Sequence, residues 1–340
     1  MLENPGLKDD QIISCLRDEY GLHVEDISFL SLGADVNSSV YRVRAGDGVN
    51  YFAKLRKGDS FHEASVVIPN FLSTLGIEQV IPPLPTRTGQ LWATLNSAKL
   101  ILYPFVEGQA GLEMKMSEQQ WFEFGAALKR FHTAEIPAGL TRSIQKDDFS
   151  PRWRDMVKMF LGYVEKETFR HPPAMELADV LRSRQDELLE IINRTEQLAQ
   201  LLLEQTPEFI LCHSDIHGYN LFIDQRGALY IVDWDGLTFA PKERDLMFIG
   251  GGHGDSGYTP QEEETMFYHG YGQTEVNQIA LTYYRYERII MDIADDCDII
   301  FRSEEGEETL KGALEDLTNK FLPDSYIAIA YQSDQKLRDM

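Results

Sequence analysis

Two short stretches in the second half of the chain carry the residues best suited to chemistry. The first contains Asp215 and, five residues later, Asn220; the second brings Asp233 thirteen residues after that asparagine. Phosphoryl transfer from a magnesium nucleotide uses such a set, in which one carboxylate orients the attacking hydroxyl while an amide oxygen and a second carboxylate hold the metal. We therefore predict Asp215 as the catalytic residue and Asn220 with Asp233 as the ligands of Mg²⁺.

The segment between Asn220 and Asp233 has the pattern of a β-hairpin. Residues 221–223 and 229–232 are apolar and flank a polar turn that contains a glycine. A hairpin would bring Asp233 beside Asn220, so we expect the polar groups to converge. Asp235 is the other candidate metal ligand, because strand alternation places it on the same face as Asp233. We prefer Asp233 as the ligand and assign Asp235 to the substrate.

Two further residues are expected to support the loop around Asp215. His213 is interpreted as a packing and hydrogen-bonding residue, and Asp245 as a brace for the loop. A carboxylate that simply starts a helix is an equal alternative for Asp245. We do not interpret Cys212 and His213 as a nucleophilic pair, because neighbouring residues on a strand point to opposite faces. His217 is interpreted as structural.

The first half of the chain carries a candidate nucleotide site. Lys54 lies in an apolar strand pattern, residues 51–55, and resembles the kinase lysine that holds the α- and β-phosphates. Glu63, on the next predicted helix, is the expected ion-pair partner of Lys54, with Asp59 as a competitor. We therefore predict that Lys54 and Glu63 belong to the nucleotide site.

A turn and a strand end complete the predicted nucleotide contacts. The turn at residues 33–39 would cover the phosphates, although it has one glycine and lacks the kinase glycine pattern, so a plain hairpin turn is a rival interpretation. The linker at residues 103–105 would present backbone groups to adenine. The predicted residues are Gly33, Asn37, Ser38, Ser39, Tyr103 and Phe105.

Acidic residues on a helical pattern near residues 276–301 are candidates for the acceptor site. At helical spacing Glu287 lies on one face, whereas Asp292, Asp295 and Asp296 form a second stripe. Like charges so placed repel one another unless cations or amines lie nearby. We assign Glu287 and Asp292 to substrate amines, with a solvated helix face as the even alternative.

The periodicity of the whole chain predicts two different halves. Strand patterns at residues 27–32, 39–44, 51–55, 91–95 and 99–104, with a helix at 61–75, indicate an antiparallel sheet with one main helix against it. Helical patterns dominate the remainder, at residues 8–20, 117–132, 174–205, 261–272, 276–301 and 306–320. The prediction is an α+β chain with a nucleotide-binding lobe at residues 1–107 and a helical lobe at 108–340.

The composition and net charge of the chain limit the classes of molecule that it is expected to bind. The 340 residues are 43% hydrophobic, which is typical of a globular protein, and no apolar run reaches the length of a membrane span. The net charge of −23 repels nucleic acid and anionic membranes and attracts small cations. Three scattered cysteines and a polar, acidic start without a signal-peptide pattern favour a cytoplasmic protein.

These motifs together resemble the aminoglycoside phosphotransferase family. Residues 211–217, 240–252 and 283–285 are similar to it, and the motif order is kept over nearly the whole chain. The resemblance implies a bilobal protein-kinase-like fold and ATP- and Mg²⁺-dependent phosphorylation of a hydroxyl on an aminocyclitol or aminoglycoside, with spectinomycin as the leading candidate. It also implies Asp215 as catalytic and Lys54 as phosphate-binding.

Two alternatives keep part of this interpretation. Kinases of choline, homoserine or sugars share the motif set and differ in the acceptor. A non-catalytic nucleotide sensor is a more distant alternative, because all the transfer residues are present. A protein kinase is disfavoured, since no Ala-Pro-Glu segment follows Asp233 at the activation-loop distance.

Overall fold

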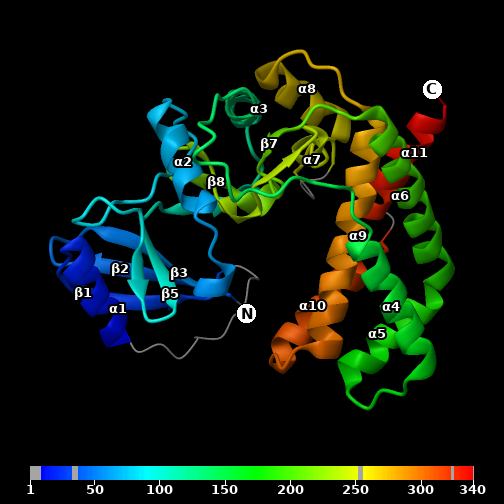
Figure 1. Cartoon of the computed structure of the whole chain (residues 1–340), viewed down its shortest axis with the longest axis horizontal. Helices are drawn as coiled ribbons and strands as arrows, with labels where there is room; N and C mark the ends of the chain where they lie inside the picture. The colour runs from blue at the N-terminus through cyan, green and yellow to red at the C-terminus, as the bar shows by residue number, and fades with distance from the viewer. Residues whose placement is uncertain (1–8, 33–36, 252–255, 323–324, 340) are drawn as a thin grey trace. The chain divides into compact units, whose positions relative to one another are not determined.

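The computed structural model describes residues 9–32, 37–251, 256–322 and 325–339, in a chain that forms two compact units (Figure 1). Unit 1 comprises residues 1–144, 218–237 and 269–271, and unit 2 comprises residues 145–217, 238–268 and 272–340. These units are defined by packing and interleave along the chain. The predicted boundary between a nucleotide-binding lobe and a helical lobe after residue 107 is a functional division and stays a prediction.

A five-stranded antiparallel sheet is the centre of unit 1, as predicted (Figure 1). Its order is β1-β2-β3-β5-β4, with β1 (Val24–Leu30), β2 (Ser38–Ala45), β3 (Asn50–Lys57), β4 (Ala93–Leu95) and β5 (Ala98–Pro104). Tyr41, Ala53 and Leu55 point into the core on one face, together with Ile12 of α1 (Asp9–Cys15). Because side chains alternate along a strand, Lys54 is left on the opposite face of β3.

Three helices of unit 1 were predicted, and the first of them, at residues 8–20, is α1 followed by a π-helical turn. The other two differ from the prediction only slightly at their ends. Helix α2 (Ala64–Thr74) begins three residues after the predicted start, and Pro69 does not end it. Helix α3 (Glu118–His132) begins with a capping box, in which the Ser117 hydroxyl accepts from the Gln120 N–H and the Gln120 side chain accepts from the Ser117 N–H. Short π- or 3₁₀-helical turns cover Leu16–Tyr20, Gly58–Ser60, Gly111–Glu113, Gly218–Asn220 and Trp234–Gly236.

The predicted hairpin is confirmed as β8 (Leu221–Asp224) and β9 (Leu229–Ile231). The Asp224 carboxylate accepts from two N–H groups of the turn, and Gly227 adopts a φ of 87° that favours glycine. A third strand, β6 (Gly108–Ala110), pairs with β8 and was not predicted. A Cβ at Gly108 would lie 2.0 Å from the Ile223 carbonyl oxygen, so this pairing depends on glycine.

Unit 2 is built from helices around α9, with a two-stranded sheet. The elements are α4 (Arg152–Lys166), α5 (Pro172–Ser183), α6 (Gln185–Gln205), β7 (Ile210–Cys212), β10 (Thr238–Ala240), α7 (Glu243–Leu246), α8 (Pro260–Tyr271), α9 (Gln278–Arg302), α10 (Glu307–Asn319) and α11 (Tyr326–Arg338). Helix α9 contacts α4, α6, α10 and α11, and α4 and α6 lie beside it in Figure 1. Its buried residues include the apolar Ile289, Ile290 and Ile293 together with charged ones such as Arg285 and Glu287.

The structure adds helices to those predicted in this unit. Residues 174–205, predicted as a helical stretch that could fold back instead of running as one rod, form parts of two helices, α5 and α6, separated at Arg184. Helices α4 and α11 were not predicted, although the buried residues Val157, Phe160, Leu161 and Val164 of α4 recur at helical spacing. Within the described part of the chain, every helix is too short or too polar to cross a membrane.

Candidate active site

A cluster of two cations and two carboxylates lies beside the sheet of unit 1. The Lys54 Nζ is 3.0 Å from Oδ1 of Asp233 and 2.7 Å from Oδ2 of Asp235. Arg56, two residues further along β3 and on the same face, contacts Asp235 at 2.5 Å and donates to the Ser60 carbonyl at 2.9 Å. The strand thus presents two positive charges to the segment that follows the hairpin.

The backbone that follows β9 explains how both carboxylates reach Lys54. Asp233 has a left-handed backbone, with φ 60°, and precedes the 3₁₀ turn Trp234–Gly236. The prediction that strand alternation places both carboxylates on one face was therefore wrong in its cause, because this segment is not extended. A non-glycine residue in this conformation is strained, and such strain is concentrated at functional sites.

Trp234 anchors the turn between the two carboxylates. Its indole N–H donates to the Ile231 carbonyl at 3.1 Å, and its ring packs edge-on against Phe131 of α3, with 5.1 Å between centroids. The side chain is almost fully buried. Because Trp234 is held in the core of unit 1, the neighbouring Asp233 and Asp235 are directed towards Lys54.

Asn220 lies where the hairpin places it, next to the backbone that leads to Asp233. The Val232 N–H donates to the Asn220 carbonyl at 2.9 Å, and Asn220 is buried. The hairpin therefore brings the backbone of Asn220 next to the residue before Asp233, as predicted. Coordination of a metal by their side chains stays a prediction.

The electrostatics of this cluster follow from its mixed charges. Burial alone would lower the pKa of Lys54, but Asp233 and Asp235 raise it above its usual value, so the lysine is a cation. Burial acts against the charge of Asp235, yet Lys54 and Arg56 bring its pKa below the usual range. The side chain of Asp233 is half exposed, and its pKa is raised, because partial burial and the neighbouring Asp235 carboxylate outweigh the attraction of Lys54.

Asp215 belongs to unit 2, where both of its carboxylate oxygens have positively polarised neighbours. Arg288 of α9 donates from Nη1 to Oδ1, and the Nε2 of His217 lies 3.5 Å from Oδ2. Burial would raise the pKa of Asp215, but the hydrogen bond from His217 and the charge of Arg288 hold it well below its usual range. Asp215 is therefore an anion at neutral pH. The sequence prediction did not include Arg288.

Asp245 braces the backbone that leads to Asp215, as predicted. Its carboxylate is fully buried and accepts from the N–H of His213 at 2.9 Å and from the N–H of Ser214 at 2.6 Å. Ser214 has a φ of 72°, so the residue directly before Asp215 is held in a left-handed conformation. Charge-assisted hydrogen bonds to buried N–H groups stabilise such a conformation.

Replacing Asp245 with Asn is expected to lower both stability and turnover. The amide offers a single acceptor oxygen, so one backbone N–H is left without this acceptor, at a cost of about 1–3 kcal/mol. Chemical denaturation with urea measures the free energy of unfolding, and Asp179→Asn, at an exposed carboxylate, is the control. Equal unfolding free energies in the two variants would exclude the bracing role.

The predicted nucleotide residues are only partly described. Gly33 lies outside the described residues. The Asn37 carbonyl accepts from the Lys57 N–H at 3.0 Å, while Ser38 and Ser39 are the first residues of β2. Ser39 was expected there, but Ser38 was expected in the turn. Their contacts with a nucleotide stay predictions.

At the other end of the sheet, Tyr103 and Phe105 flank the end of β5. Tyr103 pairs with Phe52 across the sheet, and Phe105 carries the guanidinium of Arg42 above its ring, 4.8 Å from the centroid. Burial raises the pKa of the Tyr103 hydroxyl, with Asp235 among the charges acting on it. Tyr103 thus lies near the charged cluster, whereas adenine binding stays a prediction.

The expected ion pair between Lys54 and Glu63 is not formed in this structure. Glu63 is exposed just before α2, whereas Lys54 contacts Asp233 and Asp235. The sequence favoured Glu63 because it is near in the chain, but the hairpin brings two distant carboxylates closer. A role of Glu63 at the nucleotide stays a prediction.

The three acidic residues assigned to the substrate already have cationic partners. Asp235 contacts Lys54 and Arg56, Glu287 contacts the buried Arg154 at 2.7 Å, and Asp292 contacts Arg288 at 2.8 Å. On the same helix, Asp296 contacts Lys320 at 2.7 Å. Repulsion along the acidic stripe is therefore offset by cations of the chain itself. Contacts of the three residues with a substrate stay predictions.

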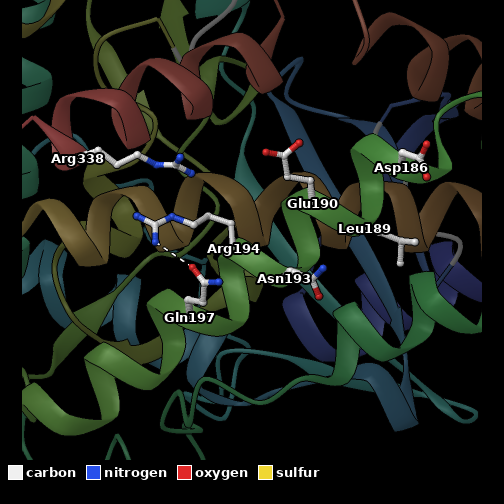
Figure 2. A pocket seen from close by; sticks show the side chains of 7 residues that line it. All are labelled: Asp186, Leu189, Glu190, Asn193, Arg194, Gln197 and Arg338. Carbon is white, nitrogen blue, oxygen red and sulfur yellow. Dashed lines mark hydrogen bonds between the residues drawn. The ribbon is translucent and has the colours of Figure 1, made fainter.

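A wide pocket elsewhere in unit 2 contains none of these residues. It has a volume of about 630 Å³ and lies along α6 and the end of α11, as Figure 2 shows. Arg194, which donates to Gln197 at 3.1 Å, and Arg338 project into it, but both contact the buried carboxylate of Asp334. The pocket thus offers no uncompensated charge for an anion.

Comparison with known proteins identifies the family. The model of the phosphotransferase enzyme family (APH) matches residues 28–277. A crystal structure of spectinomycin phosphotransferase APH(9)-Ia in complex with ADP and spectinomycin is 30% identical, with a TM-score of 0.88 over 97% of this chain and 99% of that chain. Protein StrN of Streptomyces griseus is 25% identical in an alignment of 260 residues that covers 72% of this chain and 77% of StrN.

A more distant likeness concerns the fold alone. Choline kinase LicA from Streptococcus pneumoniae is 15% identical, with a TM-score of 0.57 over 98% of this chain and 99% of that chain. The predicted α+β, protein-kinase-like fold is thereby confirmed. The chain belongs to the phosphotransferase enzyme family and is a small-molecule phosphotransferase.

Proposed function

We propose that this enzyme transfers the γ-phosphoryl group of ATP to a hydroxyl of an aminocyclitol antibiotic, with spectinomycin as the acceptor. The observation that carries the proposal is the similarity, over 97% of the chain, to a phosphotransferase whose structure contains ADP and spectinomycin. The net charge of −23 adds support, because spectinomycin is a cationic molecule and an acidic protein attracts cations.

Asp215 is the residue to which we assign the acceptor hydroxyl. An ionised carboxylate accepts a hydrogen bond from the hydroxyl and directs its oxygen at the phosphorus. The low pKa of Asp215, maintained against burial by His217 and Arg288, supports this role because the carboxylate stays ionised at neutral pH. A weakly basic carboxylate suits a loose transition state, in which orientation matters more than early removal of the proton.

Lys54 is the residue to which we assign the phosphates of the nucleotide. Its ammonium group is kept positive by Asp233 and Asp235 and lies on the face of β3 that is turned away from the core. A nucleotide phosphate would replace a carboxylate as its partner. Asn37, Ser38, Ser39, Tyr103, Phe105, Gly33 and Glu63 complete the proposed nucleotide site.

The residues around Asp233 fit a magnesium ion. Mg²⁺ prefers oxygen ligands and is commonly bound through one or two carboxylates together with substrate phosphates. Asp233 and Asp235 share one lysine, and the pKa of Asp233 is raised partly by the adjacent carboxylate, so a divalent cation would relieve this repulsion. Asn220 and Asp233 would hold the ion, which neutralises charge on the β- and γ-phosphates.

The test is the mass of the acceptor after incubation of the enzyme with spectinomycin, ATP and magnesium. The expected result is a gain of one phosphate, absent when magnesium is chelated. If spectinomycin stays unmodified and ADP is released with choline, homoserine or a sugar, that compound is the acceptor instead of spectinomycin. Binding of magnesium-ATP without turnover on any acceptor would favour a nucleotide sensor and contradict the proposal.

A further inference from the structure

Arg288 is held against Asp215 from several sides within unit 2. Its Nη1 donates to Asp215, while its Nε forms an ion pair with Oδ1 of Asp292, one helical turn further along α9, at 2.8 Å. The guanidinium also lies above the ring of Phe248, 5.5 Å from the centroid, and 17% of the side chain is exposed. The arginine therefore has little freedom to leave the carboxylate.

The contacts of Asp215 make its two oxygens different. Oδ1 is the acceptor for Arg288, whereas Oδ2 faces His217 at the longer distance of 3.5 Å. Other ionisable groups that act on this pair include Asp292 and Asp295 of α9 and Tyr326 of α11. A carboxylate fixed through one oxygen can present the lone pairs of the other in a constant direction.

We propose that Arg288 is the positioning residue of Asp215: it ties one carboxylate oxygen so that the other is directed at the acceptor hydroxyl, and Asp292 holds the arginine in place. This inference rests on the proposed role of Asp215. It concerns a residue that acts through Asp215 and not on the substrate.

The chemistry of the side chain supports this assignment over a simple charge pair. Arginine presents several N–H donors in a rigid plane, so Nη1 and Nε reach two separate carboxylates at once. Lysine would supply the same charge from a single flexible nitrogen. Charge and orientation can therefore be separated by replacing Arg288 with Gln, which removes the charge, and with Lys, which keeps it.

Helix α9 offers a closely matched control. Arg302 contacts Asp298, four residues earlier, at 3.1 Å and lies above the ring of Phe160, 5.0 Å from the centroid. Arg302→Gln thus removes an ion pair and a ring contact of the same kind from the same helix. Its side chain is half exposed, and it has no contact with Asp215 among those described.

Two measurements test the proposal. The first is kcat for phosphate transfer to spectinomycin; Arg288→Gln should lower it by about 10²-fold, the effect of a misdirected catalytic group. The KM for ATP should be unchanged. The second is a carbon-13 NMR titration of the Asp215 carboxyl, with its signal assigned through Asp215→Asn. In the parent enzyme the Asp215 carboxylate should stay ionised down to the lowest pH at which the protein is folded. In Arg288→Gln it should become protonated at a higher pH than in the parent.

The lysine variant separates the two contributions and carries the test if Arg288→Gln fails to fold. Arg288→Lys should retain the low titration of Asp215 but recover kcat only in part, while Arg302→Gln should match the parent in both measurements. An unchanged titration and kcat in Arg288→Gln, or a fall in kcat without any shift in the titration, would overturn the positioning role. Absence of transfer to spectinomycin by the parent enzyme would contradict the proposed acceptor, yet the titration would still decide on Arg288.

Discussion

Replacing Asp215 with Asn is expected to reduce kcat by about 10²–10⁴-fold, the range contributed by a positioned acid–base group. The amide keeps the shape of the carboxylate but loses its charge and one acceptor oxygen, so the acceptor hydroxyl is no longer oriented by an anion. Binding of magnesium-ATP should be unchanged, because the proposed nucleotide and metal residues are elsewhere in the chain. Steady-state release of ADP in the presence of spectinomycin measures kcat, and calorimetry measures nucleotide affinity.

The control for this replacement is Asp298→Asn. Asp298 is also paired with an arginine of α9 but is half exposed, and it should retain full turnover. Full activity of Asp215→Asn would contradict the catalytic assignment. Loss of nucleotide binding together with turnover would instead indicate that the replacement disturbs the fold of the loop that Asp245 braces.

The fold around the site could be predicted because its signals are local. The apolar runs and glycine turn of the hairpin lie within 13 residues, and the structure reproduces them as β8 and β9. The same holds for the strand that carries Lys54 and for helix α3. In each case the pattern and the element that it forms occupy the same short stretch of chain.

The partners of the charged residues could not be predicted in this way. Lys54 and Asp233 are 179 residues apart, and Arg288 and Asp215 are 73 residues apart. Such pairs are formed by tertiary packing, for which the sequence offers many competing carboxylates. A clue to Arg288 was nevertheless present, since it precedes Asp292 by four residues, the spacing of an ion pair on a helix.

The backbone at Asp233 shows a second limit. Alternation along a strand assumes an extended chain, but Asp233 is left-handed and the next residues form a 3₁₀ turn. Both carboxylates contact Lys54, so the expected convergence of Asp233 and Asp235 is found, but strand alternation is not its cause. Conformations that packing imposes on a few residues leave no periodic signal in the sequence.

The buried pair of Arg154 and Glu287 is expected to have the largest effect on stability. The Arg154 side chain is 2% exposed and that of Glu287 is 8% exposed, at an N–O distance of 2.7 Å. Removing one partner leaves an uncompensated buried charge, so Glu287→Met, and Arg154→Met at a pH above the raised pKa of Glu287, should each lower the free energy of unfolding by about 3–5 kcal/mol. Chemical denaturation measures both.

The two variants should differ in their dependence on pH. Burial raises the pKa of Glu287 to about 7, above its ordinary value, and loss of Arg154 raises it further. A carboxyl with a raised pKa in the folded state favours folding while it is protonated, below its ordinary pKa, and this contribution is lost as the pH rises through the folded-state value. Arg154→Met should therefore be closer to the parent in stability at about pH 5 than at about pH 8. Glu287→Met should show no such recovery, because arginine cannot release its proton.

Two comparisons decide whether the pair is structural or binds substrate. Replacing both residues with Met should cost less than either single change, since no charge is left buried. Lys158→Met, which breaks the half-exposed pair of Lys158 with Glu196 on the same helix α4, should cost less than about 1 kcal/mol. A substrate-binding role for Glu287 predicts the opposite pattern, a raised KM for the acceptor with unchanged stability. Because Arg154 also donates to the Phe149 carbonyl at 2.8 Å, it fixes the backbone before α4, and the structure favours the first outcome.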